Sequence, residues 1–236
     1  MDVIVCSCLL LYAAYRREVT LMHSFLLALS LLLAQAPAPA QAPAAAQTPE
    51  VTVPTWPNPT CPVMGKPISA RLYTDTKYGR IYICCKTCVK DIQDDVETNY
   101  KASYPTTVKV ENSVCPVTGS ALPKLTEGQK PVLVVLQGRE FRVADAKAAT
   151  LASEDAQATL AKLSDPKLID VANATCPVSG GAVAKNIFVV HDGRIVRLSS
   201  IKVIEDYKKD AAKYLAKALE LRAKQDAQPQ PKKAAQ

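Results

Sequence analysis

The stretch CPVMG at residues 61–65 decides the interpretation of the fold, because it returns as CPVTG at 115–119 and as CPVSG at 176–180. Each copy is followed by two short apolar runs and then by a helical pattern. A five-residue string that recurs with the same successors indicates an internal repeat. The expected strands are 70–74 and 80–84 in the first copy, 131–136 and 139–143 in the second, and 187–190 and 194–198 in the third.

The turns between these runs favour hairpins. Asp192-Gly193 separates two apolar runs in the third copy, and this dipeptide is a strong two-residue hairpin signal. Counting from Arg80, Arg139 and Arg194, we expect the three copies to align without a gap as far as the helix start. The sequence therefore predicts an α+β fold of three tandem small modules, each made of a knuckle, a β-hairpin and an α-helix.

One helix is expected after each hairpin. In the third copy, apolar residues recur at helical spacing from Ile204 to Ala218. Asp145 is placed to cap the second helix, and Ser199 or Ser200 the third. The alignment also sets Tyr100 of the first copy opposite a tyrosine of the third, Tyr214.

Composition divides the chain into six parts. The flanking segments are rich in alanine and proline or in lysine, which is typical of linkers and tails that build no core. The predicted parts are a signal or leader segment at 1–46, a disordered Pro/Ala/Thr linker at 47–59, the modules at 60–105, 114–165 and 175–222, and a basic disordered tail at 223–236.

The leader predicts export. Phe25 to Ala34 is an apolar run too short to span a bilayer, but typical of the centre of a signal peptide. Small residues at the spacing of a cleavage site follow at 38–40 and 44–46. Met22 is the simpler start of such a signal, although Met1 stays open. We expect a periplasmic or secreted protein that meets a membrane only through its leader.

Composition also excludes several classes of protein. Eight glycines argue against a glycine-lined nucleotide fold, and two histidines, His23 and His191, leave almost nothing for a His-based metalloenzyme or a Ser–His triad. His191 is expected in a surface turn. The net charge of +7 is concentrated near the C-terminus, where a solvated face is expected and not a nucleic-acid partner. We expect no enzyme, and a monomer.

The cysteines carry the chemical signal. Only the first copy adds a set to its knuckle cysteine Cys61, namely Cys84, Cys85 and Cys88. Residues four apart on a first helical turn face one side, so their thiolates can meet at the knuckle. We expect the positive end of the helix to lower the thiol pKa values. Adjacent Cys84 and Cys85 point differently, so one of them is the expected ligand beside Cys88, and the spacing does not choose between them.

These residues resemble the YHS/TRASH family of small metal-binding modules. The resemblance is carried by CPVMG at 61–65, YGRIYICCKTC at 78–88 and an acidic helix ending in Asn99-Tyr100, with the spacing Cys61-x22-Cys84-x3-Cys88. It covers 61–104 closely, and 115–165 and 176–222 in outline. It implies treble-clef-like modules and a role in handling heavy metals, copper and zinc especially. Because the later copies lack the family's ligands, they are interpreted as degenerate.

The expected cofactor is a soft or borderline transition metal ion, Cu(I) or Zn²⁺, because a thiolate-rich set selects such ions. A thioether at Met64 would favour Cu(I), although a gap-filling core residue is the simpler interpretation of this methionine. The sequence thus predicts an exported protein that binds, buffers or transfers a metal. Its partners are the ion and an extracytoplasmic protein. The predicted metal residues are Cys61, Cys84, Cys85 and Cys88.

Two alternatives stay open. In an exported protein the six cysteines after the leader could form a disulfide scaffold without metal, and six cysteines allow fifteen pairings. Cys115 and Cys176 would then be paired, or else free and buried. The second alternative is thiol redox chemistry, because Cys85-x-x-Cys88 at a helix start has the arrangement of an oxidoreductase pair.

Overall fold

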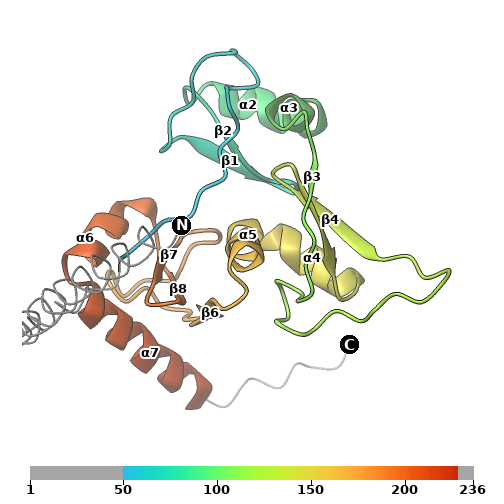
Figure 1. Cartoon of the computed structure of the whole chain (residues 1–236). Coiled ribbons are helices and arrows are strands. Elements are labelled where there is room, and N and C mark those ends of the chain that lie inside the picture. The colour runs from blue at the N-terminus through green and yellow to red at the C-terminus, as the bar shows by residue number, and fades with distance from the viewer. Residues whose placement is uncertain (1–49, 228–236) are drawn as a thin grey trace, which may run out of the picture. The chain divides into compact units, whose positions relative to one another are not determined.

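The computed structural model describes residues 50–227. In this range the protein is a mixed α+β fold with six α-helices, one short 3-10 helix and three small sheets (Figure 1). The predicted leader at 1–46, with Cys6 and Cys8, lies outside the described residues, as do 47–49 and the tail from 228 onward. No helix between residues 50 and 227 combines the length and the apolar character needed to cross a membrane.

The elements fall into three successive groups, which we name the first, second and third repeats. The first repeat (58–105) contains β1 (Tyr73–Thr76), β2 (Gly79–Tyr82), α2 (Cys88–Asp94) and α3 (Val96–Ser103). The second (106–165) contains β3 (Val108–Lys109), β4 (Val132–Leu136), β5 (Arg139–Val143), α4 (Ala146–Glu154) and α5 (Ala156–Ser164). The third (166–227) contains β6 (Ile169–Asp170), β7 (Phe188–His191), β8 (Arg194–Arg197), η1 (Ile201–Val203), α6 (Ile204–Lys209) and α7 (Ala211–Ala227).

The three predicted hairpins are confirmed. β1–β2, β4–β5 and β7–β8 each pair antiparallel around a two-residue turn. The first hairpin begins later than expected, at Tyr73 instead of Ala70. A two-residue strand not foreseen from the sequence adds to the other two sheets: β3 lies parallel to β5, and β6 parallel to β8.

The CPVxG strings form the same turn three times. In each, the glycine N–H donates to the carbonyl of the knuckle cysteine, over 2.8 Å from Gly65 to Cys61, 2.8 Å in the second repeat and 2.9 Å in the third. The glycine φ angles are +64°, +72° and +74°, in the left-handed region that side chains with a Cβ rarely adopt. Glycine therefore recurs at the end of each string because the turn requires a positive φ at this position.

An asparagine, buried in the first and third repeats and half-buried in the second, ties each knuckle to the second strand of its hairpin. The Asn58 side chain accepts from the Tyr82 N–H at 2.7 Å and donates to the carbonyls of Tyr82 and Thr60 at 3.0 and 2.7 Å. The other two repeats make the same three bonds. The asparagines, each three residues before a knuckle cysteine, are Asn58, Asn112 and Asn173. This recurrence is visible in the sequence and extends the repeat to NxxCPVxG.

Replacing Asn58 by alanine is expected to lower the free energy of unfolding by about 2 kcal/mol. The substitution leaves one N–H and two carbonyls without partners at a side chain that is 1% exposed, and a buried unsatisfied group costs about 1–3 kcal/mol. Urea denaturation followed by the fluorescence of Trp56, the single tryptophan, measures the loss. Asn112→Ala, at a half-buried position, should cost less. A change below about 0.5 kcal/mol at Asn58 would contradict this role.

The hairpin turns correct the alignment of the copies. The residues that close the turns on the second strand are Gly79, Arg139 and Arg194. The sequence suggests aligning Arg80 with Arg139 and Arg194, but this alignment is wrong by one residue. Gly79 is the first residue of its strand, whereas the glycines of the other two copies lie within the turn. With this correction the equivalent positions are Cys84, Ala144 and Ser199, and four residues later Cys88, Ala148 and Val203.

The single helix expected in each repeat is broken into two. The break is one aspartate whose backbone leaves the helical region, with φ and ψ of −142° and 78° at Asp95, −125° and 54° at Asp155, and −145° and 58° at Asp210. These aspartates occupy equivalent positions, so Tyr100 corresponds to Leu215 and not to Tyr214.

The predicted helix caps have mixed outcomes. The Asp145 side chain accepts from the Ala148 N–H at 2.7 Å, which confirms that cap. In the third repeat, Ser200 precedes η1 but its side chain makes no capping bond, so that cap is wrong.

Each repeat has its own apolar core, and a fourth cluster joins two of them. In the fourth cluster Ala158 and Ala161 of α5 pack with Phe188 and Ile195 of the third repeat, and Trp56 lies against it. Residues 50–59, expected to be a disordered linker, instead contact the fold. Thr52 pairs with Val190 through backbone bonds of 2.9 and 2.8 Å. Helix α7 likewise continues to Ala227, past the expected start of the tail.

Polar side chains at the turns connect all three repeats, and we call this set the turn junction. At its centre Gln137, in the second hairpin turn, donates its backbone N–H to the Tyr78 carbonyl of the first turn at 3.0 Å. The Gln157 side chain donates to Gln137, and the Gln157 N–H donates to the Asn186 side chain at 3.1 Å. Arg80 of the first repeat donates to the Asn186 carbonyl, also at 3.1 Å.

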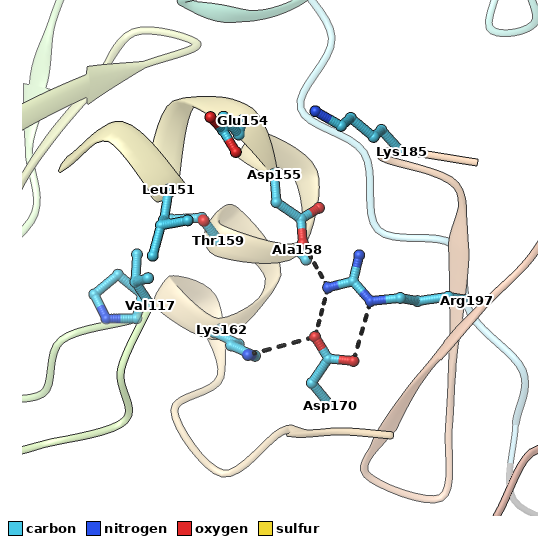
Figure 2. A pocket seen from close by; sticks show the side chains of 11 residues that line it. Val117, Leu151, Glu154, Asp155, Ala158, Thr159, Lys162, Asp170, Lys185 and Arg197 are labelled. Carbon is cyan, nitrogen blue, oxygen red and sulfur yellow. Dashed lines mark hydrogen bonds and ion pairs between the residues drawn. The ribbon is translucent and has the colours of Figure 1, made fainter. Parts of the chain in front are cut away.

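A second polar contact fixes the helix break of the second repeat to the third (Figure 2). The Arg197 guanidinium on β8 donates to both oxygens of Asp170, at 2.6 and 3.3 Å, and also to Asp155 at the break. Lys162 lies 3.6 Å from Asp170. Burial alone would raise the pKa of Asp170, but the bonds to Arg197 outweigh it and hold this pKa below its usual value.

Candidate metal centre

Three of the four predicted metal residues meet. The sulfur atoms of Cys61, Cys84 and Cys88 all lie within 4.8 Å of one another. Cys61 comes from the knuckle, Cys84 follows the end of β2, and Cys88 is the first residue of α2. The convergence of knuckle and helix start inferred from spacing is thereby confirmed.

The geometry of this thiol set fits a metal ion. A tetrahedral ion with bonds of about 2.3 Å to sulfur separates its ligands by about 3.8 Å, and the sulfur atoms of Cys84 and Cys88 are 3.9 Å apart. Cys61 and Cys88 are 0% and 1% exposed and pack against Ile81, Ile83 and other apolar residues of the first core. Cys84 is half-buried, so the set is closed on the core side and reaches the surface at one corner.

Cys85 lies beside the set without joining it. Its sulfur is 3.8 Å from that of Cys84 and 3.4 Å from that of Cys88, but it is not among the three that lie within 4.8 Å of one another. The Thr87 hydroxyl lies 3.0 Å from the Cys85 sulfur. Of the two adjacent cysteines, Cys84 is therefore the one that faces Cys61.

The thiol pKa values differ from the uniform lowering expected from the helix end. Burial, followed by hydrogen bonding with Cys85, raises the pKa of Cys88 to about 12, and burial also raises that of Cys84. For Cys61, backbone N–H groups outweigh burial and the pKa is lowered. Hydrogen bonding with Thr87 and Cys88 lowers the pKa of Cys85 to about 7. Thiolate binding of a metal would therefore release protons from Cys84 and Cys88 at neutral pH.

The later repeats keep the knuckle and lose the other thiols. The positions around Cys115 hold Thr118, Ala144 and Ala148, and those around Cys176 hold Ser179, Ser199 and Val203. Burial raises the pKa of the Cys176 thiol, but hydrogen bonds with Ser179 and Ser199 outweigh it, and the pKa is lowered. In the third repeat, hydroxyl groups thus occupy the positions that Cys84 and Met64 have in the first.

No disulfide forms among the six cysteines between residues 50 and 227. Cys115 and Cys176 are each buried in the core of their own repeat, so the alternative of free, buried knuckle thiols is the one observed. Cys85 and Cys88 are close enough for a disulfide to form with a small shift of the side chains.

Two other residues lie where the sequence did not place them. Met64 is 51% exposed at the tip of the first knuckle, so it fills no core gap. His191, expected on the surface, is buried at the end of β7, with its Nδ1 3.1 Å from the Tyr207 hydroxyl. It belongs to the third core and lies outside the thiol set.

Comparison with known proteins adds no identification. Scans against protein-family models, curated proteins and solved structures give no match.

Proposed function

We propose that the protein is an exported, monomeric, non-enzymatic metal-binding protein that holds one Cu(I) or Zn²⁺ ion on Cys61, Cys84 and Cys88. The observation that carries this proposal is the convergence of three sulfur atoms to within 4.8 Å, two of them in an apolar core. Thiolate ligands favour soft and borderline ions over hard ones such as Mg²⁺ and Ca²⁺.

The open corner of the site favours buffering or transfer over a purely structural role. Structural zinc sites are closed by four protein ligands, whereas here three thiols converge and one of them, Cys84, is half-buried. Met64, exposed on the same knuckle, offers a thioether to a Cu(I) ion that enters or leaves. An extracytoplasmic protein that approaches this corner is the partner that such a site would serve.

The resemblance to YHS/TRASH modules supports the same function through its spacing, Cys61-x22-Cys84-x3-Cys88. In this proposal the first repeat is the metal-competent, treble-clef-like module. The second and third repeats are degenerate modules that hold it in place. Neither of the later repeats has a second thiol beside its knuckle cysteine, so no further ion of this kind is proposed there.

Native mass spectrometry of the reduced full-length protein tests the proposal. With one equivalent of Zn²⁺ or Cu(I), we expect one added ion per chain and an equal stoichiometry in excess metal. A reduced sample that gains no mass would overturn it. A disulfide scaffold would instead lose two protons for each bond formed on oxidation.

Thiol–disulfide exchange is the second candidate, and the 3.4 Å between the sulfur atoms of Cys85 and Cys88 favours it. Insulin reduction by dithiothreitol separates the two functions. A metal-binding protein should not accelerate the reaction above the uncatalysed rate, and a redox protein should. The Cys85→Ser variant is the control, since it removes the exchanging pair and leaves the three converging thiols in place.

A further inference from the structure

A cavity of about 550 Å³ lies on the other face of the first hairpin from the metal centre. Its walls come from β1 and β2, from the η1–α6 segment of the third repeat, and from Val53 and Thr55 of the entering chain. This volume is within the range of small-molecule sites, about 300–1,000 Å³.

Strand β2 contributes to both sites through the alternation of its side chains. Ile81, and Ile83 just after the strand, point to the core that contains Cys61. Arg80 and Tyr82 point the opposite way and line the cavity. The cavity therefore shares a strand with the metal centre but none of its ligands.

The walls of the cavity suit an apolar body. The Tyr73 ring and the side chains of Val53, Ile201 and Ile204 line it, and Val53 and Ile201 are exposed hydrophobic residues. Burying these side chains against a ligand would remove apolar surface from water.

The charges at the cavity suit an anion. Arg71 and Lys202 line it and make no salt bridge within the described part of the chain. The other two cations there are already paired: Arg80 bonds Asp75 at 2.8 Å, and Lys208 lies 3.3 Å from Glu205, the one acidic lining residue. Two cations therefore remain for a ligand.

A buried hydroxyl gives an independent indication of a missing partner. Tyr82 lines the cavity and is 1% exposed, yet no group between residues 50 and 227 forms a hydrogen bond with its hydroxyl. Buried polar groups are nearly always paired, and leaving one unpaired is costly. A ligand atom that accepts from this hydroxyl would remove that cost.

We propose that this cavity binds a small amphipathic anion, an aromatic or aliphatic carboxylate or sulfonate. The apolar body lies against Tyr73, Ile201 and Ile204. The acid group lies between the cations Arg71 and Lys202, and Tyr82 donates a hydrogen bond to the ligand. This site is separate from the proposed metal function.

The smaller cavity in Figure 2, about 330 Å³, does not offer the same chemistry. Its central cation, Arg197, is already bound to Asp155 and Asp170. Glu154 adds a further negative charge to its lining. Lys185, which makes no salt bridge within the described part of the chain, is balanced by Glu154, so the net positive charge is at the cavity of about 550 Å³.

Fluorescence titration of the full-length protein with 1-anilinonaphthalene-8-sulfonate tests the proposal, because this probe combines an aromatic body with one anionic group. We expect saturable binding at one site, weakened at least about tenfold in the double variant Arg71→Gln, Lys202→Gln, since hydrogen bonds to charged groups are the strong ones. N-phenyl-1-naphthylamine, the uncharged analogue, should bind at least about tenfold more weakly to the wild type. Decanoate should displace the sulfonate probe more effectively than decanol.

The matched control is Lys213→Gln with Lys217→Gln on α7, which removes the same charge away from the cavity and should leave the affinity unchanged. Tyr82→Phe should weaken binding by a few-fold, and its urea curve shows whether it folds. If Tyr82→Phe does not fold, the probe affinity of the Arg71→Gln, Lys202→Gln double variant still tests the proposal. The proposal is wrong if the wild type does not bind the probe, if both double variants bind alike, or if the charged and neutral probes bind equally.

Discussion

Replacing Cys88 by serine is expected to lower the affinity for Cu(I) or Zn²⁺ by more than about 100-fold. Changes outside the ligand shell of a metal site already cost about 10–100-fold, and this change removes a ligand. The Cys88 sulfur is 3.9 Å from that of Cys84 and is 1% exposed, so water does not take its place without rearrangement. The Cys85 sulfur lies outside the group of sulfur atoms within 4.8 Å of one another, so it also needs a rearrangement to join Cys61 and Cys84. A neutral hydroxyl is also a poor ligand for a soft ion.

A competition titration against a chromophoric chelator measures this loss, with the number of ions read by mass spectrometry. The matched controls are Cys115→Ser and Cys176→Ser, which alter equivalent knuckle thiols without neighbouring cysteines and should leave the stoichiometry unchanged. Cys85→Ser should have a smaller effect than Cys88→Ser. The opposite pattern, with Cys176→Ser abolishing binding and Cys88→Ser retaining it, would place the metal site in the third repeat and contradict the proposal.

The Arg197→Met substitution is expected to lower the free energy of unfolding by about 3 kcal/mol at pH 7. Removing one partner of a buried ion pair typically costs about 3–5 kcal/mol, because the other charge is left buried. Asp170 is 13% exposed at its side chain and would lose two bonds to Arg197. The lower end of the range applies since Asp155 is more exposed and can reach water.

The pH dependence of this loss identifies its cause. The pKa of Asp170 is held below the unfolded value of about 3.9, so its stabilising effect is present above that value and is lost as the pH falls through the folded value. In the Arg197→Met variant the Asp170 carboxyl can take up a proton. The loss in free energy of unfolding relative to the wild type should therefore be smaller at pH 3 than at pH 7. Urea curves at both pH values measure it. The control Lys224→Met, at an exposed ion pair with Glu220, should change stability by less than about 0.5 kcal/mol. An equal deficit for Arg197→Met at both pH values would exclude the charge explanation.

The parts of the fold that local chemistry dictates could be predicted from the sequence. Asp192-Gly193 fixes a two-residue turn by its backbone preference, and both strands of that hairpin lie within one residue of the expected ends. The Asp145 cap is a contact between residues three apart. Such features need no knowledge of distant neighbours.

Features that depend on distant partners could not be predicted. Strand β6 exists because it pairs with β8, more than twenty residues later. Aspartates within a helical pattern are ordinarily interpreted as a solvated face, but Asp155 interrupts the helix and its side chain binds Arg197 of another repeat. The one-residue shift in alignment has the same origin, because the pairing at Gly79 sets it and not the matching of arginines.

The candidate metal centre also combines features that could be predicted from the sequence with features that could not. The meeting of Cys61 and Cys88 follows from knuckle and helix-start geometry, whereas the choice between Cys84 and Cys85 depends on how the chain leaves β2. The expected lowering of the thiol pKa values is wrong for Cys84 and Cys88, because burial in the apolar core outweighs the end of a seven-residue helix.

The turn junction has a consequence for how the chain would respond to the proposed metal ion. Since Gln137, Gln157 and Asn186 share their hydrogen bonds across all three repeats, unfolding one repeat exposes groups of the other two. We therefore expect the three repeats to unfold together as one cooperative unit. An ion bound at the proposed site would therefore raise the free energy of unfolding of the whole unit. The increase grows with the logarithm of the ratio of free ion concentration to dissociation constant. If the first repeat binds an ion as proposed, the free ion concentration would set the stability of all three repeats and not of the first alone.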